Sequence, residues 1–250
     1  MQRTESEIKA AADPRILTDL VLANRILYRL GVLDAHGHVS ARDPKHPEHF
    51  FLARSLAPGL VTAGDIMAYD SDSAPVEPRG RAMYSERFIH GEVYRARPDV
   101  HAVVHSHSPT VIPFSISKTA MRPVYHMASF IAQAAPVFEI REAEARGDLL
   151  VKSTTLGRAL AQTLGGNTVA LLRGHGNVVV GPDVRYAVFR AYHTEINARL
   201  QLQARGLDGP LTYISAAESA DTFGGMGIPP DRAWEMWVRE VSDPHTSGRL

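Results

Sequence analysis

Apolar positions along the chain follow two periods, one of about 3.6 residues and one of two, and together they predict a mixed α and β structure. After the pair Asp13-Pro14, apolar residues recur three or four positions apart, at Ile16, Leu20, Ala23 and Leu27. Aspartate caps helices and proline suits the first helical position, so this pair predicts the start of a helix with one core-facing side.

The same reasoning divides the rest of the chain into short elements. Short β segments are predicted at 39–42, 50–53, 66–69, 99–107, 135–140 and 168–172. Helices are predicted at 86–96, 155–164 and 183–205, the first of them capped by Ser85. The polar stretch 70–80 is expected to form a hairpin and loop, and 121–128 a loop. No internal repeat interrupts this pattern, so we expect one domain over residues 1–250.

Composition narrows the class of protein. The chain has 250 residues, with 27 basic and 27 acidic side chains, so charge gives no reason to expect a nucleic acid or membrane partner. It has no cysteine, which leaves histidine and carboxylate as the metal-binding repertoire. The first twelve residues are polar and charged, unlike a signal peptide, and no apolar run approaches the length of a membrane span. We therefore expect a cytoplasmic protein.

Candidate chemistry gathers on four residues. His105 and His107 lie two apart at a predicted strand end, so their side chains point to the same face and can chelate one ion. His175 lies between two glycines and between two apolar β-like runs, where a turn can bring an imidazole into a crowded site. Glu86 opens a predicted helix. Taken singly, the pair could be unrelated, His175 could face solvent, and Glu86 could simply favour the helix dipole.

Order and spacing of these segments resemble the class II aldolase/adducin family over roughly residues 17–213. The resemblance rests on 37–42, on Ser85-Glu86 with His90 one turn later, on 97–107 and on 174–176. It implies that His105, His107 and His175 bind a divalent metal, and that Glu86 is an acid/base that also touches the metal when no substrate is bound. The implied fold is α/β, an α+β three-layer sandwich whose central, mainly antiparallel sheet is flanked by helices, with the metal at a sheet edge.

The chain departs from the sugar-phosphate aldolases of this family where those enzymes hold phosphate. His38, the segment 54–59 and Tyr84-Ser85 replace an asparagine, a Thr/Ser-Gly loop and a pair of serines. An imidazole, a guanidinium and a phenol suit a planar anion such as an aryl carboxylate. His126 stands where related aldolases carry a loop tyrosine.

These departures, with segments 107–117 and 122–127, make the chain resemble the aromatic-decarboxylase branch, typified by hydroxy-methylpyridine-dicarboxylate and dihydroxyphthalate decarboxylases. The resemblance implies a metal-dependent lyase of aromatic-compound catabolism that removes carbon dioxide from a hydroxylated aromatic or pyridine (di)carboxylate. Manganese or zinc is the expected metal, and iron(II) also suits three histidines.

Individual roles follow from the same resemblance. Glu86, kept protonated by a dry pocket and the substrate's charge, is expected to protonate the ring carbon that loses carbon dioxide. The substrate-binding candidates are His38, Arg54 and Ser85. His126 and Tyr213 are candidate proton partners.

Three other functions stay open at this point. They are a class II aldolase acting on an unphosphorylated substrate, a non-heme iron oxygenase and a non-catalytic, adducin-like interaction module. The module is disfavoured because it needs no metal triad. Residues 212–250 are expected to be a C-terminal extension in which Trp234 and Trp237, at helical spacing, serve core or subunit packing. Relatives are commonly homotetramers with active sites at subunit interfaces, which implies the same assembly here.

Overall fold

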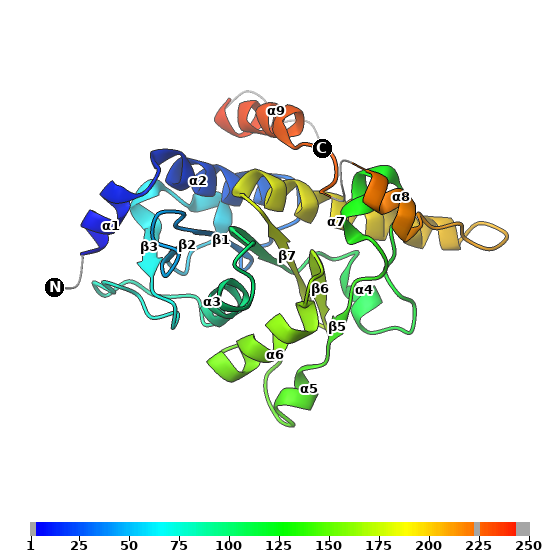
Figure 1. Ribbon diagram of the computed structural model, residues 1–250, viewed down its shortest axis with the longest axis horizontal. Helices are drawn as coiled ribbons and strands as arrows, with labels where there is room; N and C mark the ends of the chain where they lie inside the picture. The colour runs from blue at the N-terminus through cyan, green and yellow to red at the C-terminus, as the bar shows by residue number, and fades with distance from the viewer. Residues whose placement is uncertain (1–3, 223–225, 244–250) are drawn as a thin grey trace.

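The computed structural model describes residues 4–222 and 226–243, and a seven-stranded sheet organises this part of the chain (Figure 1). The strands are β1 (His38–Arg42), β2 (Phe50–Ala53), β3 (Ile66–Tyr69), β4 (Ala102–Ser106), β5 (Val137–Phe138), β6 (Val169–Leu172) and β7 (Gly176–Gly181). Their order is β3-β2-β1-β4-β7-β6-β5, and every neighbouring pair is antiparallel except β5 with β6. The predicted, mainly antiparallel sheet is confirmed.

Helices cover both faces of this sheet, which gives the three layers that were expected (Figure 1). On one face lie α2 (Pro14–Arg29) and α7 (Val184–Arg205), and on the other α3 (Arg87–Ala96) and α6 (Thr154–Leu164). The remaining helices are α1 (Glu5–Ala11), α4 (Ile112–Ser115), α5 (Ile140–Ala143), α8 (Ala216–Asp221), α9 (Asp231–Ser242) and the 3₁₀ turns η1 (Pro58–Leu60), η2 (Ala63–Asp65) and η3 (His126–Ile131). Within the described ranges no helix has the length and apolar content to cross a bilayer.

The centre of the sheet is the core of the molecule and also aligns the residues of the site. All residues of β4 and β7 are buried, as expected for strands covered by helices on both faces. In the β1–β4 pair, His38 lies directly opposite His105. Side chains of directly opposed residues project from the same face of a sheet, so the register alone makes these two imidazoles neighbours.

One helix was not predicted, and one predicted helix start needs correction. Residues 5–11 form a helix that begins with a reciprocal capping box of Thr4 and Glu7. In α3 the N-cap is Glu86, not Ser85, and the Glu86 side chain makes no capping hydrogen bond. The Glu86 carboxylate is therefore not used by its own helix and can serve the site.

The C-terminal helix α9 packs against α2 and α7 of the same chain (Figure 1). Trp234 and Trp237 are both buried, and the Trp237 ring centroid lies 5.2 Å from that of Tyr192. Of the two uses predicted for these tryptophans, core packing is thus the one the structure shows. The predicted part of residues 212–250 in subunit contacts stays a prediction, and 223–225 and 244–250 lie outside the described residues.

Candidate metal centre

Three histidines and a glutamate from separate parts of the chain meet at one end of the central strand β4. Glu86, His105, His107 and His175 each offer one ligand atom, and these four atoms lie within 4.8 Å of one another. The structure therefore brings together the four residues that the sequence had singled out. It places them at the end of β4, the middle strand of the sheet; the resemblance had implied a metal at a sheet edge.

The turn that carries His175 depends on the glycines at both sides of it. Gly174 has φ +65°, in the left-handed region that favours glycine. A Cβ on Gly176 would lie 2.0 Å from the Ser106 carbonyl oxygen, so only glycine lets β7 approach β4 at this point. The two glycines thus hold His175 against the end of β4, beside His105.

Each of the three imidazoles has its Nδ1 atom beside an oxygen that can only accept a hydrogen bond. The pairs are His105 with the Asn177 carbonyl at 3.2 Å, His107 with Asp34 Oδ2 at 3.0 Å, and His175 with the Leu149 carbonyl at 3.1 Å. Nδ1 must therefore carry the proton, which leaves the Nε2 lone pair of each ring for the centre of the cluster. This is the arrangement that orients histidine ligands in metal sites.

Whether a metal fits the site can be judged from the partners of the three Nε2 lone pairs. His105 Nε2 is buried and has no hydrogen-bond partner among the described residues. His107 Nε2 and His175 Nε2 are 3.0 Å apart, and with both protons on Nδ1 neither can donate to the other. Glu86 Oε2 lies 3.6 Å from His105 Nε2 and 3.5 Å from His175 Nε2. A divalent cation would give all four atoms a partner, so the residues fit the metal that the resemblance implied.

The charge state of Glu86 follows from the groups around its carboxylate. We expected a dry pocket and the charge of the bound substrate together to keep it protonated, and burial alone does raise its pKa. The imidazoles of His105 and His175 and the Val151 N–H oppose burial and lower the Glu86 pKa to about 2. Burial also lowers the His175 pKa to about 4, so that ring is neutral. The site therefore pairs an ionised carboxylate with a neutral imidazole at neutral pH.

One stretch of main chain, which we call the strap (residues 149–151), holds two members of the cluster. The Val151 N–H donates to Glu86 Oε1 at 2.8 Å, and the Leu149 carbonyl accepts from His175 Nδ1. Leu149 adopts φ +67°, unusual for a residue with a side chain. This role could not be predicted from the residue types, because the groups that act belong to the backbone.

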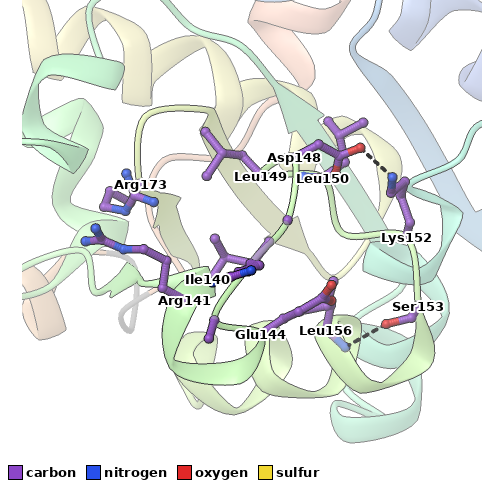
Figure 2. A pocket seen from close by; sticks show the side chains of 13 residues that line it. Ile140, Arg141, Glu144, Asp148, Leu149, Leu150, Lys152, Ser153, Leu156 and Arg173 are labelled. Carbon is purple, nitrogen blue, oxygen red and sulfur yellow. Dashed lines mark hydrogen bonds and ion pairs between the residues drawn. The ribbon is translucent and has the colours of Figure 1, made fainter.

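Residues of the strap line two cavities. One of them, of about 620 Å³, includes Leu149 and Leu150 in its lining, together with several basic side chains (Figure 2). Two of these, Arg141 and Arg173, pair with Glu139, and Lys152 pairs with Asp148. These basic groups therefore already have acidic partners.

The other cavity, of about 650 Å³, opens directly onto the cluster. His38, Ser85, Glu86, His107 and His175 all line it, so two of the three predicted substrate-binding residues face it. Its volume is in the range of small-molecule sites. Arg54 is not among its lining residues, and its Nε donates to Asp65 Oδ1 at 2.7 Å. The structure thus gives the predicted carboxylate-binding arginine another partner.

The two predicted proton partners do not line this cavity within one chain. His126 is exposed at the start of η3, and the Tyr213 ring lies under the Arg122 guanidinium, 4.2 Å from its carbon. Their roles at a subunit interface stay predictions. Asp34, which orients His107, was missed, because nothing in its sequence context marks it.

Comparison with known proteins places these features in a family. Residues 18–202 match the model of the class II aldolase and adducin N-terminal domain. The chain is 37% identical to decarboxylase tropJ of Talaromyces stipitatus over 86% of this chain and 90% of that protein. It is 30% identical to 3,4-dihydroxyphthalate decarboxylase of Arthrobacter keyseri over 89% of this chain and 92% of that protein. Its fold resembles an aldolase II superfamily protein of Pseudomonas syringae, with TM-score 0.78 and 23% identity over 96% of this chain and 98% of that one.

Proposed function

The chain belongs to the class II aldolase and adducin family, and on that premise we propose that it is a metal-dependent lyase that decarboxylates a hydroxylated aromatic or pyridine carboxylate. One observation carries the proposal: the cluster opens onto a cavity whose wall contains flat, uncharged rings where a sugar-phosphate enzyme would need phosphate donors. The ring centroids of His38 and Tyr84 are 4.4 Å apart, and the His38 centroid is 5.1 Å from that of His105.

The rest of the cavity lining supports an aromatic acid as substrate. Leu56, Met83 and Leu150 supply apolar surface, and Ser85 and His38 supply polar groups. An aromatic ring packs well against such a wall, while its carboxylate needs only a few directed donors. The name of one of the two relatives includes a phthalate with two ring hydroxyls, which has the size and groups that this lining accommodates.

A mechanism follows from the chemistry of the residues. His105, His107 and His175 would hold the metal, with Glu86 beside it; a divalent ion there supplies Lewis acidity that stabilises negative charge developing on the substrate. Ionised Glu86 accepts the proton of the ring hydroxyl next to the carboxylate. Glu86 then returns this proton to the ring carbon that bears the carboxylate.

Loss of carbon dioxide completes the reaction. The bond between that ring carbon and the carboxylate breaks, and its electron pair returns to the ring. Carbon dioxide leaves, Glu86 is again ionised, and the ring oxygen takes one proton from solvent. The net change is therefore one carboxylate and one proton converted to one C–H bond and carbon dioxide. Because Glu86 starts ionised, the proton it delivers comes from the substrate and not from a stored acid.

The test is carbon dioxide release from manganese-reconstituted protein given ortho-hydroxylated aromatic mono- and dicarboxylates, 3,4-dihydroxyphthalate among them, with and without dioxygen. We expect release that ignores dioxygen, is lost in Glu86→Gln with metal still bound, and persists in the control Glu92→Gln. Glu92 is a buried glutamate of the same helix that pairs with Arg95, outside the cavity. Aldehyde formation or dioxygen uptake without carbon dioxide would instead favour an aldolase or an oxygenase.

Assembly and metal identity complete the proposal. We infer a homotetramer with manganese or zinc. A subunit contact near the site is supported by Ile116, which is 64% exposed and lies beside Gly174 at the cluster. Light scattering after gel filtration and elemental analysis of purified protein test these two points. A cytoplasmic location stays a prediction.

A further inference from the structure

A chain of four hydrogen-bonding side chains runs from the cavity wall into the core between the sheet and α3. His38 Nδ1 is 2.7 Å from His90 Nε2, His90 Nδ1 is 2.6 Å from Ser40 Oγ, and Ser40 Oγ is 2.7 Å from the Tyr94 hydroxyl. All four residues are buried, and of these only His38 lines the cavity. The mechanism above does not use the other three.

The links of this chain are uncharged, so each carries a single proton to donate. Burial lowers the pKa of His90 to about 3, and the 2.7 Å contact between His90 Nε2 and His38 Nδ1 requires one of these two nitrogens to accept. Burial raises the pKa of Tyr94. A neutral imidazole has one donor and one acceptor nitrogen, and a hydroxyl donates once. The protons along the chain can consequently point in only one of two directions.

The inner end of the chain selects the direction. Among the described residues the Ser40 hydroxyl oxygen is the one acceptor that the Tyr94 hydroxyl reaches. If Tyr94 donates to Ser40, the Ser40 proton must go to His90 Nδ1, because the described residues offer it no other acceptor. His90 must then carry its proton on Nε2 and donate it to His38 Nδ1. The opposite direction would leave the Tyr94 proton buried without an acceptor, which costs about 1–3 kcal/mol.

We infer that Tyr94, Ser40 and His90 are positioning residues that fix His38 with its proton on Nε2, as a hydrogen-bond donor to a carboxylate of the bound substrate. The His38 ring contacts the rings of both Tyr84 and His105 and lines the cavity, so it lies beside the metal cluster. A carboxylate accepts such a bond, whereas the opposite tautomer would turn a lone pair toward it. The identity of the acceptor rests on the proposed function; the tautomer of His38 does not.

The experiment reads the tautomer directly. In zinc-loaded, ¹⁵N-histidine-labelled protein, long-range ¹H–¹⁵N spectra distinguish protons on Nδ1 and Nε2, and His38→Asn assigns the signal. We expect wild-type His38 to be protonated on Nε2. In Tyr94→Phe the first donor is gone and Ser40 is free to accept from His90, so part of the His38 population should move its proton to Nδ1.

Affinity for phthalate, an unreactive dicarboxylate without ring hydroxyls, provides the second readout. Complete loss of one charge-assisted hydrogen bond corresponds to a weakening on the order of ten-fold. Because only part of the His38 population shifts, we expect phthalate to bind Tyr94→Phe measurably more weakly in calorimetry, by up to about that factor. The matched control is Tyr69→Phe. The ring centroids of Tyr69 and Tyr94 lie at similar distances from that of Phe50, 5.3 and 5.4 Å. The Tyr69 hydroxyl contacts the Met67 sulfur and is not part of the hydrogen-bond chain.

Two results would overturn the inference. One is a wild-type His38 that carries its proton on Nδ1; the other is a Tyr94→Phe protein that matches Tyr69→Phe in both tautomer and phthalate affinity. Wild-type protein that binds no phthalate would refute the carboxylate role of His38 while the tautomer result stands on its own. Neither readout measures carbon dioxide, so failure of the decarboxylase proposal is distinguishable from failure of this one.

Discussion

Asp34 should control how tightly the cluster holds its metal, although it is not a ligand. Asp34 Oδ1 accepts the main-chain N–H groups of His36 and Gly37 at 2.8 and 2.9 Å, and Oδ2 faces His107 Nδ1. In Asp34→Asn the amide oxygen remains with the two main-chain donors, so the NH₂ group takes the place of Oδ2. That group faces a nitrogen that is itself a donor. His107 must then shift its proton to Nε2, the atom meant for the metal.

The size of the effect follows from the setting of this contact. Loss of a group that orients a metal-binding histidine typically weakens metal binding about ten- to a hundred-fold. The Asp34 side chain is 47% exposed, so water can replace part of what the carboxylate does. We therefore expect the low end, about ten-fold in the zinc dissociation constant, or about 1.4 kcal/mol.

Competition with a chromophoric chelator gives the zinc dissociation constant at fixed pH and salt. The control is Glu48→Gln, because Glu48 is a comparably exposed carboxylate, 3.8 and 3.7 Å from His46 and His49 and away from the cluster. We expect wild-type affinity in this control. Equal zinc affinity in Asp34→Asn, Glu48→Gln and wild type would refute the view that Asp34 sets the His107 tautomer.

Three further results are expected. Gly176→Ala should lower the free energy of unfolding in urea by about 1–3 kcal/mol and abolish zinc binding, since its Cβ would meet the Ser106 carbonyl. The control Gly166→Ala, with open space around it, should do neither. Equal urea midpoints for the two variants would contradict this. Burial lowers the His193 pKa from 6.5 to about 4, so its neutral form adds stability above pH 6.5 that is lost as pH falls toward 4. In urea titrations of metal-free protein, the free energy of unfolding should fall between pH 7 and pH 5 by about 2 kcal/mol less in His193→Asn than in wild type. An identical fall in both proteins would count against this role of His193. Trp237→Ala should cost about 3–5 kcal/mol in the same assay yet leave zinc affinity of the folded protein unchanged; a smaller cost would mean that α9 packs loosely.

The parts of the fold with local signals could be predicted from sequence. Asp13-Pro14 begins α2 as expected, and Asp183 caps α7, because capping depends on residues within one turn. The capping box of Thr4 and Glu7 carried the same kind of signal for α1 and was overlooked, since so short a helix shows little apolar periodicity. β5 proved shorter than predicted, two residues, because pairing with β6 and not propensity sets its ends.

The site was predictable in its ligands but not in its surroundings. Imidazoles at a strand end and in a Gly-His-Gly turn are visible in sequence, and the structure gathers them. Contacts between segments distant in the sequence are not visible there. Asp65 pairs with Arg54 across 11 positions, and Val151 donates to Glu86 across 65, which helps to hold that carboxylate ionised. These contacts are the reason that Arg54 and Glu86 differ from the roles expected of them.

The strap has a consequence for how this enzyme can diverge. It holds Glu86 and His175 through main-chain groups that almost every amino acid provides, and Val151→Pro is the plain exception because proline lacks the N–H. The Leu150 side chain, in contrast, faces the substrate cavity. Mutations at this position can therefore alter which substrate is accepted while the ligand geometry is inherited unchanged. A new specificity can arise on this segment without the catalytic centre having to be reinvented.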